Sequence, residues 1–596
     1  MAEIKSEASV NGTLSKIFHE MSGMYRFIGE REKFRAVAYE NASKTIRNLP
    51  EEISHYTIDH HLKKLSGIGE SIEEKIFEFL DSGKIHKYEE LKKRVPYELL
   101  EFIDISGFGP QTLKVIHDKL DINSKDELID ALQNGRLETL KGFGKKKVEN
   151  LRRALKLHKV IEERMLLGTA VQLGEKILER LMKLPQVLRA EIAGSVRRGK
   201  ETIGDIDIIL ASKEKDRKKI ISAFTSMDLV ARILAKGDTK ASVIVKDLTR
   251  QVDLRIVNEE EWGSALLYFT GSKEHNIRLR TIAKERGMKI SEYGLFDVKS
   301  GKRIAGATEE EIYRKLGFEF VPPEMREDIG ELEIAARNKI PSLIVLKDIR
   351  GDLQMHSKWS DGSENILTIA EYVMKNFDYD YIVMTDHSKS SRIAGGLDEK
   401  DFRKQFKEIE EVNEKLKKNF VKKGAEVDIL SDGSLDLPDE LLEQMDWVTA
   451  SIHAGFKNDN TDRLIAACEN PFVNCIGHPS GILIGEREAY PVNWDKLFEA
   501  AEQTGTALEI NAQPQRLDLN AELARKAAST GVTLTISTDA HTLSNFSFMR
   551  FGVMTARRGW CAAKQVLNTK SWSELEKFRK AKQNLLLHQM AREHSS

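Results

Sequence analysis

Two short segments in the middle of the chain alternate between apolar and charged residues. In the first, Asp205 and Asp207 are separated and followed by isoleucines, and in the second, residues 251–257, Asp253 alternates with apolar positions in the same way. Successive side chains of a strand point to opposite faces. The pattern therefore predicts two strands whose apolar residues enter a core and whose aspartates lie on an open face.

The second half of the chain has a different pattern, in which short apolar runs alternate with helical stretches from about residue 345. This alternation favours a barrel of βα units, where polar residues at the C-terminal ends of the strands carry the chemistry. A pair of prolines at 322–323 marks the boundary before it. The strands are expected to start near Ile349, Tyr381, Ala425, Trp447, Val473, Ala507 and Val532.

The N-terminal part of the chain repeats a glycine motif. Three Gly-x-Gly turns each precede an amphipathic segment, and each is expected to expose N–H groups at a helix start, where a DNA phosphate can bind without base recognition. One such turn is weak evidence, but three with similar apolar flanks look like helix-hairpin-helix elements. The glycines are Gly67, Gly69, Gly107, Gly109, Gly142 and Gly144.

The aspartates of the two central strands predict a metal site. Adjacent carboxylates repel one another unless a cation lies between them, and a pair of Mg²⁺ or Mn²⁺ ions can activate an attacking oxygen and stabilise a leaving pyrophosphate. Asp253 is the candidate third ligand and general base for a 3′-hydroxyl. Just before them, Gly194, Ser195 and Arg198 offer a triphosphate close backbone approach, a hydroxyl and a guanidinium. A merely solvated strand face is the alternative, but phosphate and metal binders occurring together favour nucleotidyl transfer.

Four motifs in this order resemble the palm and nucleotide pocket of family X DNA polymerases. They are Gly-Ser-x-Arg-Arg-Gly from Gly194, Gly-Asp-x-Asp from Gly204, the Asp-x-Arg strand at Asp253 and Tyr-Phe-Thr-Gly-Ser from Tyr268. The resemblance implies that Asp205, Asp207 and Asp253 hold the metals. It assigns to the triphosphate Arg164, Gly194, Ser195, Arg198 and Gly204.

The same resemblance assigns the rest of the nucleotide pocket. Tyr268 and Phe269, leading into the turn at Gly271, would stack on the sugar and disfavour a ribonucleotide. Asn276 and Arg280 would contact the minor-groove side of the nascent pair. Lys273 stands where vertebrate members carry an acid, and we expect this cation to hold the incoming nucleotide more tightly.

Lys75 follows the first glycine turn, where family X enzymes carry the lysine that attacks an abasic sugar. Ser71 replaces a supporting lysine of the vertebrate lyases. We therefore favour binding of a 5′-phosphate at a gap over lyase activity, with lyase activity as the alternative.

The predicted strand ends of the second half carry a repeated set of histidines and acids. This half resembles the polymerase and histidinol phosphatase (PHP) domain, a distorted seven-stranded barrel that acts as a metal-dependent phosphoesterase. Carried over by residue, the ligands are His356, Asp361, His387, Glu426, His453, His478, Asp539 and His541. Imidazoles and carboxylates suit two to three Mn²⁺ or Zn²⁺ ions. The usual His-x-His opening is Gln354-Met355-His356 here, so one ion is expected to bind weakly.

The predicted fold class is multidomain: helix-hairpin-helix domains, an α/β nucleotidyltransferase palm with a thumb-like domain, and a distorted (βα)₇ barrel. The expected boundaries are a helical DNA-binding domain (1–90), a fingers-like domain (91–162), the palm (163–260), the thumb-like domain (261–320), a linker (321–345), the PHP barrel (346–575) and a charged tail (576–596).

The composition is consistent with an intracellular enzyme. The 596 residues carry a net charge of −1, which does not by itself suggest a DNA-binding protein, and the three cysteines suit neither a zinc ribbon nor a disulfide framework. No apolar run reaches membrane-spanning length and no signal-peptide core is present at the N-terminus, so a cytoplasmic, nucleoid-associated location is expected.

The predicted function is template-directed gap filling in base excision repair. The partners are gapped or nicked DNA and deoxynucleoside triphosphates, the protein is expected to be a monomer, and the barrel is expected to act as a Mn²⁺-dependent 3′→5′ exonuclease or 3′-end phosphatase. Four alternatives stay open: a DNA-end nuclease or phosphatase whose polymerase half only grips DNA, a template-independent terminal transferase, a non-catalytic DNA-end scaffold, and a barrel whose metals serve stability alone.

Overall fold

The structure is a computed structural model that describes residues 10–47, 53–54, 56, 62, 65, 67–103, 105, 107–162, 164–246 and 248–593. The predicted domain limits at residues 1, 163 and 596 lie outside these ranges. The chain divides into two compact units, residues 1–163 and 164–596, each described by itself.

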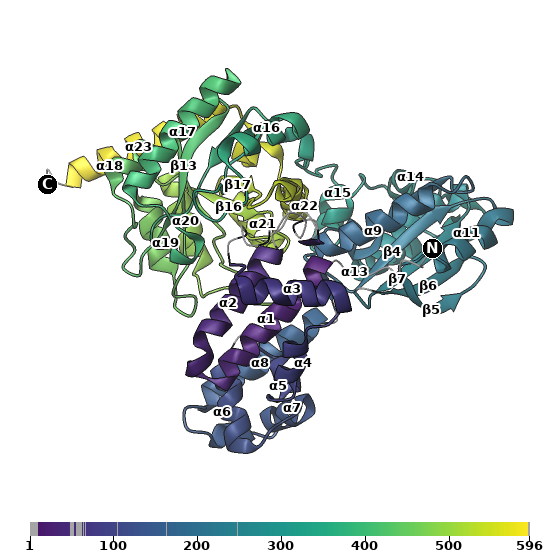
Figure 1. Ribbon diagram of the computed structural model, residues 1–596. Helices are drawn as coiled ribbons and strands as arrows, with labels where there is room; N and C mark the ends of the chain where they lie inside the picture. The colour runs from purple at the N-terminus through teal and green to yellow at the C-terminus, as the bar shows by residue number, and fades with distance from the viewer. Residues whose placement is uncertain are drawn as a thin grey trace. The chain divides into compact units, whose positions relative to one another are not determined.

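The N-terminal unit is helical (Figure 1). One cluster of buried apolar residues extends from Leu14 to Leu151, so its helices share a single core across the predicted boundary at 90/91. Its α-helices are α1 (Val10–Ile28), α2 (Lys33–Arg47), α3 (Glu70–Ser82), α4 (His86–Lys92), α5 (Tyr97–Leu100), α6 (Pro110–Leu120), α7 (Lys125–Gln133) and α8 (Lys145–Glu162).

The second unit begins with a five-stranded sheet of order β2-β4-β7-β6-β5. Only β4 and β7 run parallel; the other neighbours are antiparallel. The strands are β2 (Arg189–Ile192), β4 (Asp205–Ala211), β5 (Val230–Lys236), β6 (Lys240–Val245) and β7 (Gln251–Val257), and the short β1 (Met165–Leu166) pairs with β3 (Thr202–Ile203). Helices α9 (Leu167–Met182) and α11 (Arg217–Thr225) share its apolar core.

A smaller helix-and-sheet region follows the five-stranded sheet. An antiparallel sheet of order β10-β9-β8 packs with α12, α13 and α14 around one apolar cluster. The elements are α12 (Trp262–Thr270), α13 (Lys273–Glu285), β8 (Met288–Ser291), β9 (Gly294–Asp297), β10 (Arg303–Ala305) and α14 (Glu309–Lys315). The segment up to the barrel holds α15 (Glu331–Ala335) and short 3₁₀ turns.

Seven parallel strands in sequence order form the C-terminal barrel. They are β11 (Gly351–Asp352), β12 (Tyr381–Met384), β13 (Val421–Asp428), β14 (Trp447–Ser451), β15 (Cys475–Ile476), β16 (Ala507–Asn511) and β17 (Leu534–Ser537). The first and last meet through a parallel bridge between Met355 and Ala540, where the His356 N–H donates to the Ala540 carbonyl at 2.9 Å. The predicted (βα)₇ fold class is confirmed, and the observed strands start within a few residues of the predicted ones.

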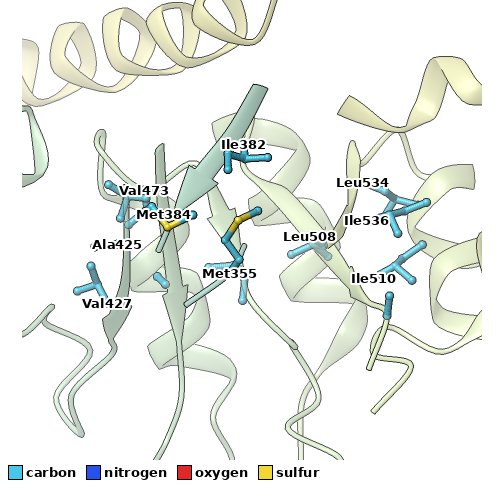
Figure 2. Packing of buried hydrophobic residues seen from close by; sticks show 14 of the residues in the cluster. Met355, Ile382, Met384, Ala425, Val427, Val473, Leu508, Ile510, Leu534 and Ile536 are labelled. Carbon is cyan, nitrogen blue, oxygen red and sulfur yellow. The ribbon is translucent and has the colours of Figure 1, made fainter. Parts of the chain in front are cut away.

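The two faces of the barrel strands have separate roles. Residues such as Ile382, Met384 and Ile510 point outward and pack with the surrounding helices (Figure 2). Their neighbours in sequence, including Tyr381 and Val383, form an inner apolar cluster at the starts of the strands. The helices are α16 (Ile366–Asn376), α17 (Glu399–Leu416), α18 (Asp439–Leu442), α19 (Thr461–Glu469), α20 (Trp494–Thr504), α21 (Ala521–Ser529) and α22 (Met549–Arg558).

The last helix, α23 (Trp572–Glu593), belongs to the barrel. Leu575 is buried in the inner apolar cluster, and the Trp572 ring lies 5.1 Å from the Tyr381 ring. Lys582 is buried and donates to the Cys468 carbonyl at 2.8 Å. The helix therefore covers the N-terminal end of the barrel strands and runs across the predicted boundary at 575/576. The polar residues lie at the C-terminal ends of the barrel strands.

Candidate functional site

The paired strands β4 and β7 bring the three predicted aspartates together. Asp207 lies beside Asp253 in the parallel register, and Asp205 precedes Asp207 by two residues on the same face. Ile206, between Asp205 and Asp207, and Ile208, after Asp207, are fully buried in the sheet core. The alternation predicted from sequence is therefore what points all three carboxylates to one side of the sheet.

The environment of these carboxylates favours a bound cation. Burial, followed by the charges of Asp205 and Asp253, raises the pKa of Asp207 to about 7. Burial and Asp253 also raise the pKa of Asp205. Mutual repulsion of this kind is relieved by a divalent ion with oxygen ligands, so the residues fit Mg²⁺ or Mn²⁺.

The turn α10 (Gly194–Arg197) lies directly against the aspartates. Gly194 has φ +61°, and a side chain there would collide with the Asp207 carboxylate. Both observations require glycine at this position. The adjacent Ser195 and Arg198 line the same pocket as Asp205 and Asp207. The turn thus places a hydroxyl and a guanidinium beside the carboxylates.

One pocket collects most of the residues predicted to bind the nucleotide. Its lining comes from β4, α10 and the region of α12 and α13, and consists of Gly194, Ser195, Arg198, Asp205, Asp207, Tyr268, Phe269, Thr270, Gly271, Lys273, Asn276 and Arg280. The rings of Tyr268 and Phe269 meet edge to face at 5.1 Å. Asn276 donates to the Tyr268 carbonyl at 2.7 Å and so connects α13 to the aromatic pair.

Three predicted residues lie outside this lining. Asp253 is held from the side by Gln251, whose amide donates to its carboxylate at 2.9 and 3.1 Å. Arg164 donates to the Thr202 hydroxyl at 2.9 Å and approaches Gly204. The sequence interpretation missed Thr270, which lines the pocket and whose carbonyl accepts a hydrogen bond from Arg198.

The eight predicted barrel ligands converge at the C-terminal ends of the strands. Glu426 lies at the centre, with its carboxylate 2.9 Å from His478, 3.2 Å from His387 and 3.4 Å from His453. The other ligands complete three overlapping groups whose ligand atoms lie within 4.8 Å of one another. These groups are His356/Asp361/His387/His541, His387/Glu426/His453 and His356/Glu426/Asp539.

The donor set of the barrel fits Mn²⁺ or Zn²⁺. Burial lowers the pKa of His387 and His478 to about 4, which keeps both imidazoles neutral. Burial opposes protonation of His453, but Glu426 and Asp428 raise its pKa to about 10. The buried Nδ1 atoms of His356 and His478 have no hydrogen-bond partner among the described residues. A site for several metal ions needs imidazole nitrogens that are free to bind metal and lie close to carboxylates.

The barrel ligands are supported by residues that the sequence interpretation did not identify. Asp428 contacts Nδ1 of His453, and Asn511 donates to Asp539 at 3.1 Å. Asp386 accepts from the Ser357 and Ser360 hydroxyls at 2.7 and 2.6 Å and fixes the loop that carries Asp361. Such partners orient metal ligands. A carboxylate following a predicted strand was the only signal that could have suggested Asp386.

Two of the barrel ligands have strained backbones. His478 has φ +29° and Asp539 φ +50°, in the left-handed region that side chains other than glycine rarely adopt. The surrounding fold holds both, because the His478 N–H donates to the buried Glu509 at 2.7 Å and the Asp539 N–H to the Gln354 carbonyl at 3.0 Å. Strain of this kind concentrates at functional sites.

Known proteins resemble this chain over most of its length. Residues 168–277 match the model for the DNA polymerase beta palm and 265–327 that for the DNA polymerase beta thumb. Residues 9–85 match a helix-hairpin-helix domain, and 99–157 a SAM-like helix-hairpin-helix tandem. The DNA polymerase/3′-5′ exonuclease PolX of Bacillus subtilis (strain 168) is 37% identical over 565 residues, covering 94% of this chain and 98% of the relative. The chain belongs to the family X DNA polymerases.

Two further relatives match about half of this chain. DNA polymerase lambda of Arabidopsis thaliana is 26% identical over 53% of this chain and 62% of its own length, and that of Rattus norvegicus is 26% identical over 50% of this chain and 53% of its own length. The PolX relative extends through the barrel as well. The predicted family and enzyme class are therefore confirmed.

The predicted hairpins of this family X polymerase share one geometry. The first glycine of each turn has positive φ, +81° at Gly67, +92° at Gly107 and +86° at Gly142. The second glycine, Gly69, Gly109 or Gly144, immediately precedes α3, α6 or α8. The residue between them is buried in each turn. Each turn therefore presents backbone N–H groups at a helix start.

Lys75 lies on α3, one turn beyond Ser71. Its ammonium donates to the Ser71 carbonyl at 2.8 Å and to the Ser71 hydroxyl at 3.0 Å. Partial burial lowers its pKa. The serine that replaces the expected lysine thus binds Lys75 directly.

In the described parts of the chain, no helix combines the length and apolar character that a bilayer crossing needs.

Proposed function

We propose that this protein is a DNA-directed DNA polymerase that fills short gaps in DNA and whose barrel removes nucleotides from 3′ ends. The observation that carries the polymerase assignment is the register that places Asp207 beside Asp253, on the side of the sheet where Ser195 and Arg198 line a pocket.

The aspartates would act together with the turn that follows β2. Two divalent ions held by Asp205, Asp207 and Asp253 would lower the pKa of the primer 3′-hydroxyl and neutralise the leaving pyrophosphate. Asp253 accepts the hydroxyl proton. Ser195 and Arg198 hold the terminal phosphates, so that the 3′-oxygen attacks the α-phosphate in line and pyrophosphate leaves toward them.

The wall formed by α12 and α13 would select the nucleotide. Tyr268 and Phe269 stack on the sugar and crowd its 2′ position. Asn276 and Arg280 face the minor-groove side of the nascent pair, and Lys273 adds a cation to the pocket. Arg164 and Gly204 support the site from the β3 side.

In the barrel, the eight ligands would hold two to three Mn²⁺ or Zn²⁺ ions, which activate a water for attack on a phosphodiester. Asp428 keeps His453 oriented toward Glu426. Gln354 replaces the first ligand of the usual set, and both polar atoms of its buried amide lack hydrogen-bond partners among the described residues. The carboxamide oxygen is a weaker donor than imidazole for these metals.

The N-terminal unit would hold gapped or nicked DNA. The N–H groups that follow Gly67, Gly107 and Gly142 bind phosphates of the DNA backbone without reading its sequence. Lys75, held by Ser71, binds a 5′-phosphate at the gap.

We expect borohydride to trap no adduct with abasic DNA, and a trapped adduct that Lys75→Ala removes would establish lyase chemistry instead. Monomeric state, a role in base excision repair and a cytoplasmic, nucleoid-associated location stay predictions.

Extension of a primer across a one-nucleotide gap tests the assignment. Asp205→Ala/Asp207→Ala should abolish extension with Mg²⁺ and leave Mn²⁺-dependent 3′ degradation intact. Asp539→Ala should do the reverse. Extension by the double-aspartate variant at the native rate would overturn the proposal, and extension without a template strand would favour terminal transfer.

A further inference from the structure

Helix α22 of the barrel touches the turn that is proposed to bind the triphosphate. The Arg558 guanidinium donates to the Arg198 carbonyl at 2.9 Å. Gly199, with φ +66°, packs against Met554 and the aliphatic part of Arg558. A side chain at residue 199 would meet both within 3.4 Å. The barrel thus contacts the backbone of the turn itself.

A second connection passes through Glu327, the last residue that matches the thumb model. One carboxylate oxygen of Glu327 accepts from Arg198 Nε at 3.2 Å and from Arg558 Nη1 at 3.0 Å. Lys200 lies 3.5 Å from the other oxygen. Glu327 therefore joins the guanidinium of the nucleotide pocket to the guanidinium of the barrel.

The charges of this cluster are largely removed from water. The side chain of Arg558 is 7% exposed, that of Arg198 13% and that of Glu327 18%. Burial opposes ionisation of Glu327, but Arg558 and then Arg198 lower its pKa below the ordinary value. Hydrogen bonds between charges in such surroundings are stronger than at the surface. Glu201, 4.0 Å from Arg558 Nε, is a more distant partner.

The contacts of Arg198 fix how it can meet a ligand. Its Nε is held by Glu327, and its Nη1 by the Thr270 carbonyl. Among the described residues these bonds engage Nε and Nη1 and leave Nη2 for a phosphate. Holding the other nitrogens in place reduces the ordering that nucleotide binding would otherwise require.

We propose that Glu327 and Arg558 are positioning residues for Arg198, so that the barrel completes the nucleotide pocket of the polymerase. This inference rests on the proposed role of Arg198 in triphosphate binding. With Arg558 present, the Glu327 carboxylate interacts with Arg558, Arg198 and Lys200 together. It then orients Arg198 through Nε and leaves Nη2 for the triphosphate. Without Arg558, Glu327 pairs more fully with Arg198 and competes with the triphosphate, and the turn loses its backbone anchor.

The neighbouring residue provides a matched control. Arg557 also lies on α22 and also binds an acid of the connecting segment, donating to Glu324 at 2.6 Å and to the Ile344 carbonyl at 2.9 Å. It makes none of the contacts with Arg198 or Glu327 that Arg558 makes. Loss of Arg557 therefore weakens barrel docking to a similar degree and leaves Arg198 held.

Steady-state gap filling by the full chain with dNTP titration tests the proposal. Arg558→Met should raise the dNTP KM about tenfold, as expected for loss of a charge-assisted hydrogen bond, with kcat changed less than about threefold. Arg558→Lys should recover part of the affinity because an ammonium still balances Glu327. Arg557→Met should leave KM within about twofold of the wild type. Equal KM effects of Arg557→Met and Arg558→Met would overturn the inference in favour of a general docking role.

A double-mutant cycle separates this inference from the function on which it rests. If Arg558 acts through Arg198, Arg558→Met should raise KM no further in an Arg198→Ala background. An unchanged KM for Arg198→Ala alone would refute its role in triphosphate binding. A raised KM for Arg198→Ala with no effect of Arg558→Met would refute only the positioning role. Retained Mn²⁺ nuclease activity shows that each variant is folded.

Discussion

The two candidate metal sites of this chain differ in how completely they are formed. In the barrel, ligand atoms already lie within 4.8 Å of one another in three groups, and five of the eight candidate ligands are buried. Among the described residues, the three aspartates of the sheet form no group that compact. Asp205 and Asp207 line a pocket whose lining does not include Asp253, and Asp205 is exposed.

The difference follows from what each site has to bind. A hydrolytic site uses only water besides its substrate, so its ions can be resident and its ligands can be fixed by the fold. A polymerase site receives a triphosphate that carries its own Mg²⁺ and must release pyrophosphate in every cycle. We infer that the barrel is preorganised for its ions, whereas the aspartates complete their site only with the nucleotide.

The largest expected effect concerns the barrel. Asp539→Ala/His541→Ala removes one candidate ligand from each of two of the three groups, and Mn²⁺-dependent degradation of 3′ ends should fall by about 10³-fold or more. Digestion of a labelled single strand measures it. The matched control Ser544→Ala removes an exposed hydroxyl of the same loop, which bonds the Thr542 hydroxyl rather than a candidate ligand. Nuclease activity that survives the double substitution would place its source elsewhere.

The next prediction uses the repulsion among the aspartates. The raised pKa of Asp207, about 7, means that the fold disfavours its ionised form. The free-energy penalty of ionising Asp207 in the folded chain is small near pH 4 and grows as the pH rises to about 7. Above that pH Asp207 is ionised in both folded and unfolded chains, and the penalty grows no further. Asp207→Asn should therefore stabilise the metal-free protein by on the order of 2 kcal/mol above pH 7 and little near pH 4. Thermal unfolding at pH 5 and pH 8 measures this difference, and an equal gain at both values would contradict it.

Gln354→His tests whether the departure from the usual ligand set matters. The imidazole should restore a ligand and tighten Mn²⁺ binding in the barrel about tenfold. Calorimetric titration of the metal-free protein compares the two, with Gln354→Leu as the matched loss of the amide. If Gln354→Leu and wild type bind equally and Gln354→His no better, residue 354 does not contact an ion.

The smallest expected effect concerns Lys273 at the start of α13. Its charge in an open pocket should contribute a few-fold to dNTP affinity before catalytic metals bind, because exposed charge pairs are weak. Nucleotide titration without Mg²⁺ measures the dissociation constant for wild type, Lys273→Ala and Lys273→Met. An unchanged constant in both variants would contradict this role.

Local patterns predicted the positions of these sites but not the contacts between them. Alternation placed Asp205, Asp207 and Asp253 on one face, and strand ends indicated the candidate ligands of the barrel, because both depend on short-range periodicity. The links from Arg558 to Glu327 and Arg198 join residues more than 100 positions apart. No local pattern encodes such a contact.

The residues that support the candidate barrel ligands could not be predicted from local sequence patterns for the same reason. Asp428, Asn511 and Asp386 are ordinary polar residues in sequence, and only the closed barrel brings each of them to a ligand or to a ligand loop. The packing of α23 under the barrel was also missed, because its charged sequence conceals the few apolar residues, such as Leu575, that face inward.

Mn²⁺ binding measured by electron paramagnetic resonance, with and without a non-hydrolysable dNTP and gapped DNA, tests the contrast between the sites most directly. The account predicts that wild type takes up the barrel ions without nucleotide and about two more ions with it. Asp205→Ala/Asp207→Ala should lose only the nucleotide-dependent ions, and Asp539→Ala/His541→Ala only the others. Equal uptake by the aspartates without nucleotide, or loss of the nucleotide-dependent ions from the barrel variant, would contradict it.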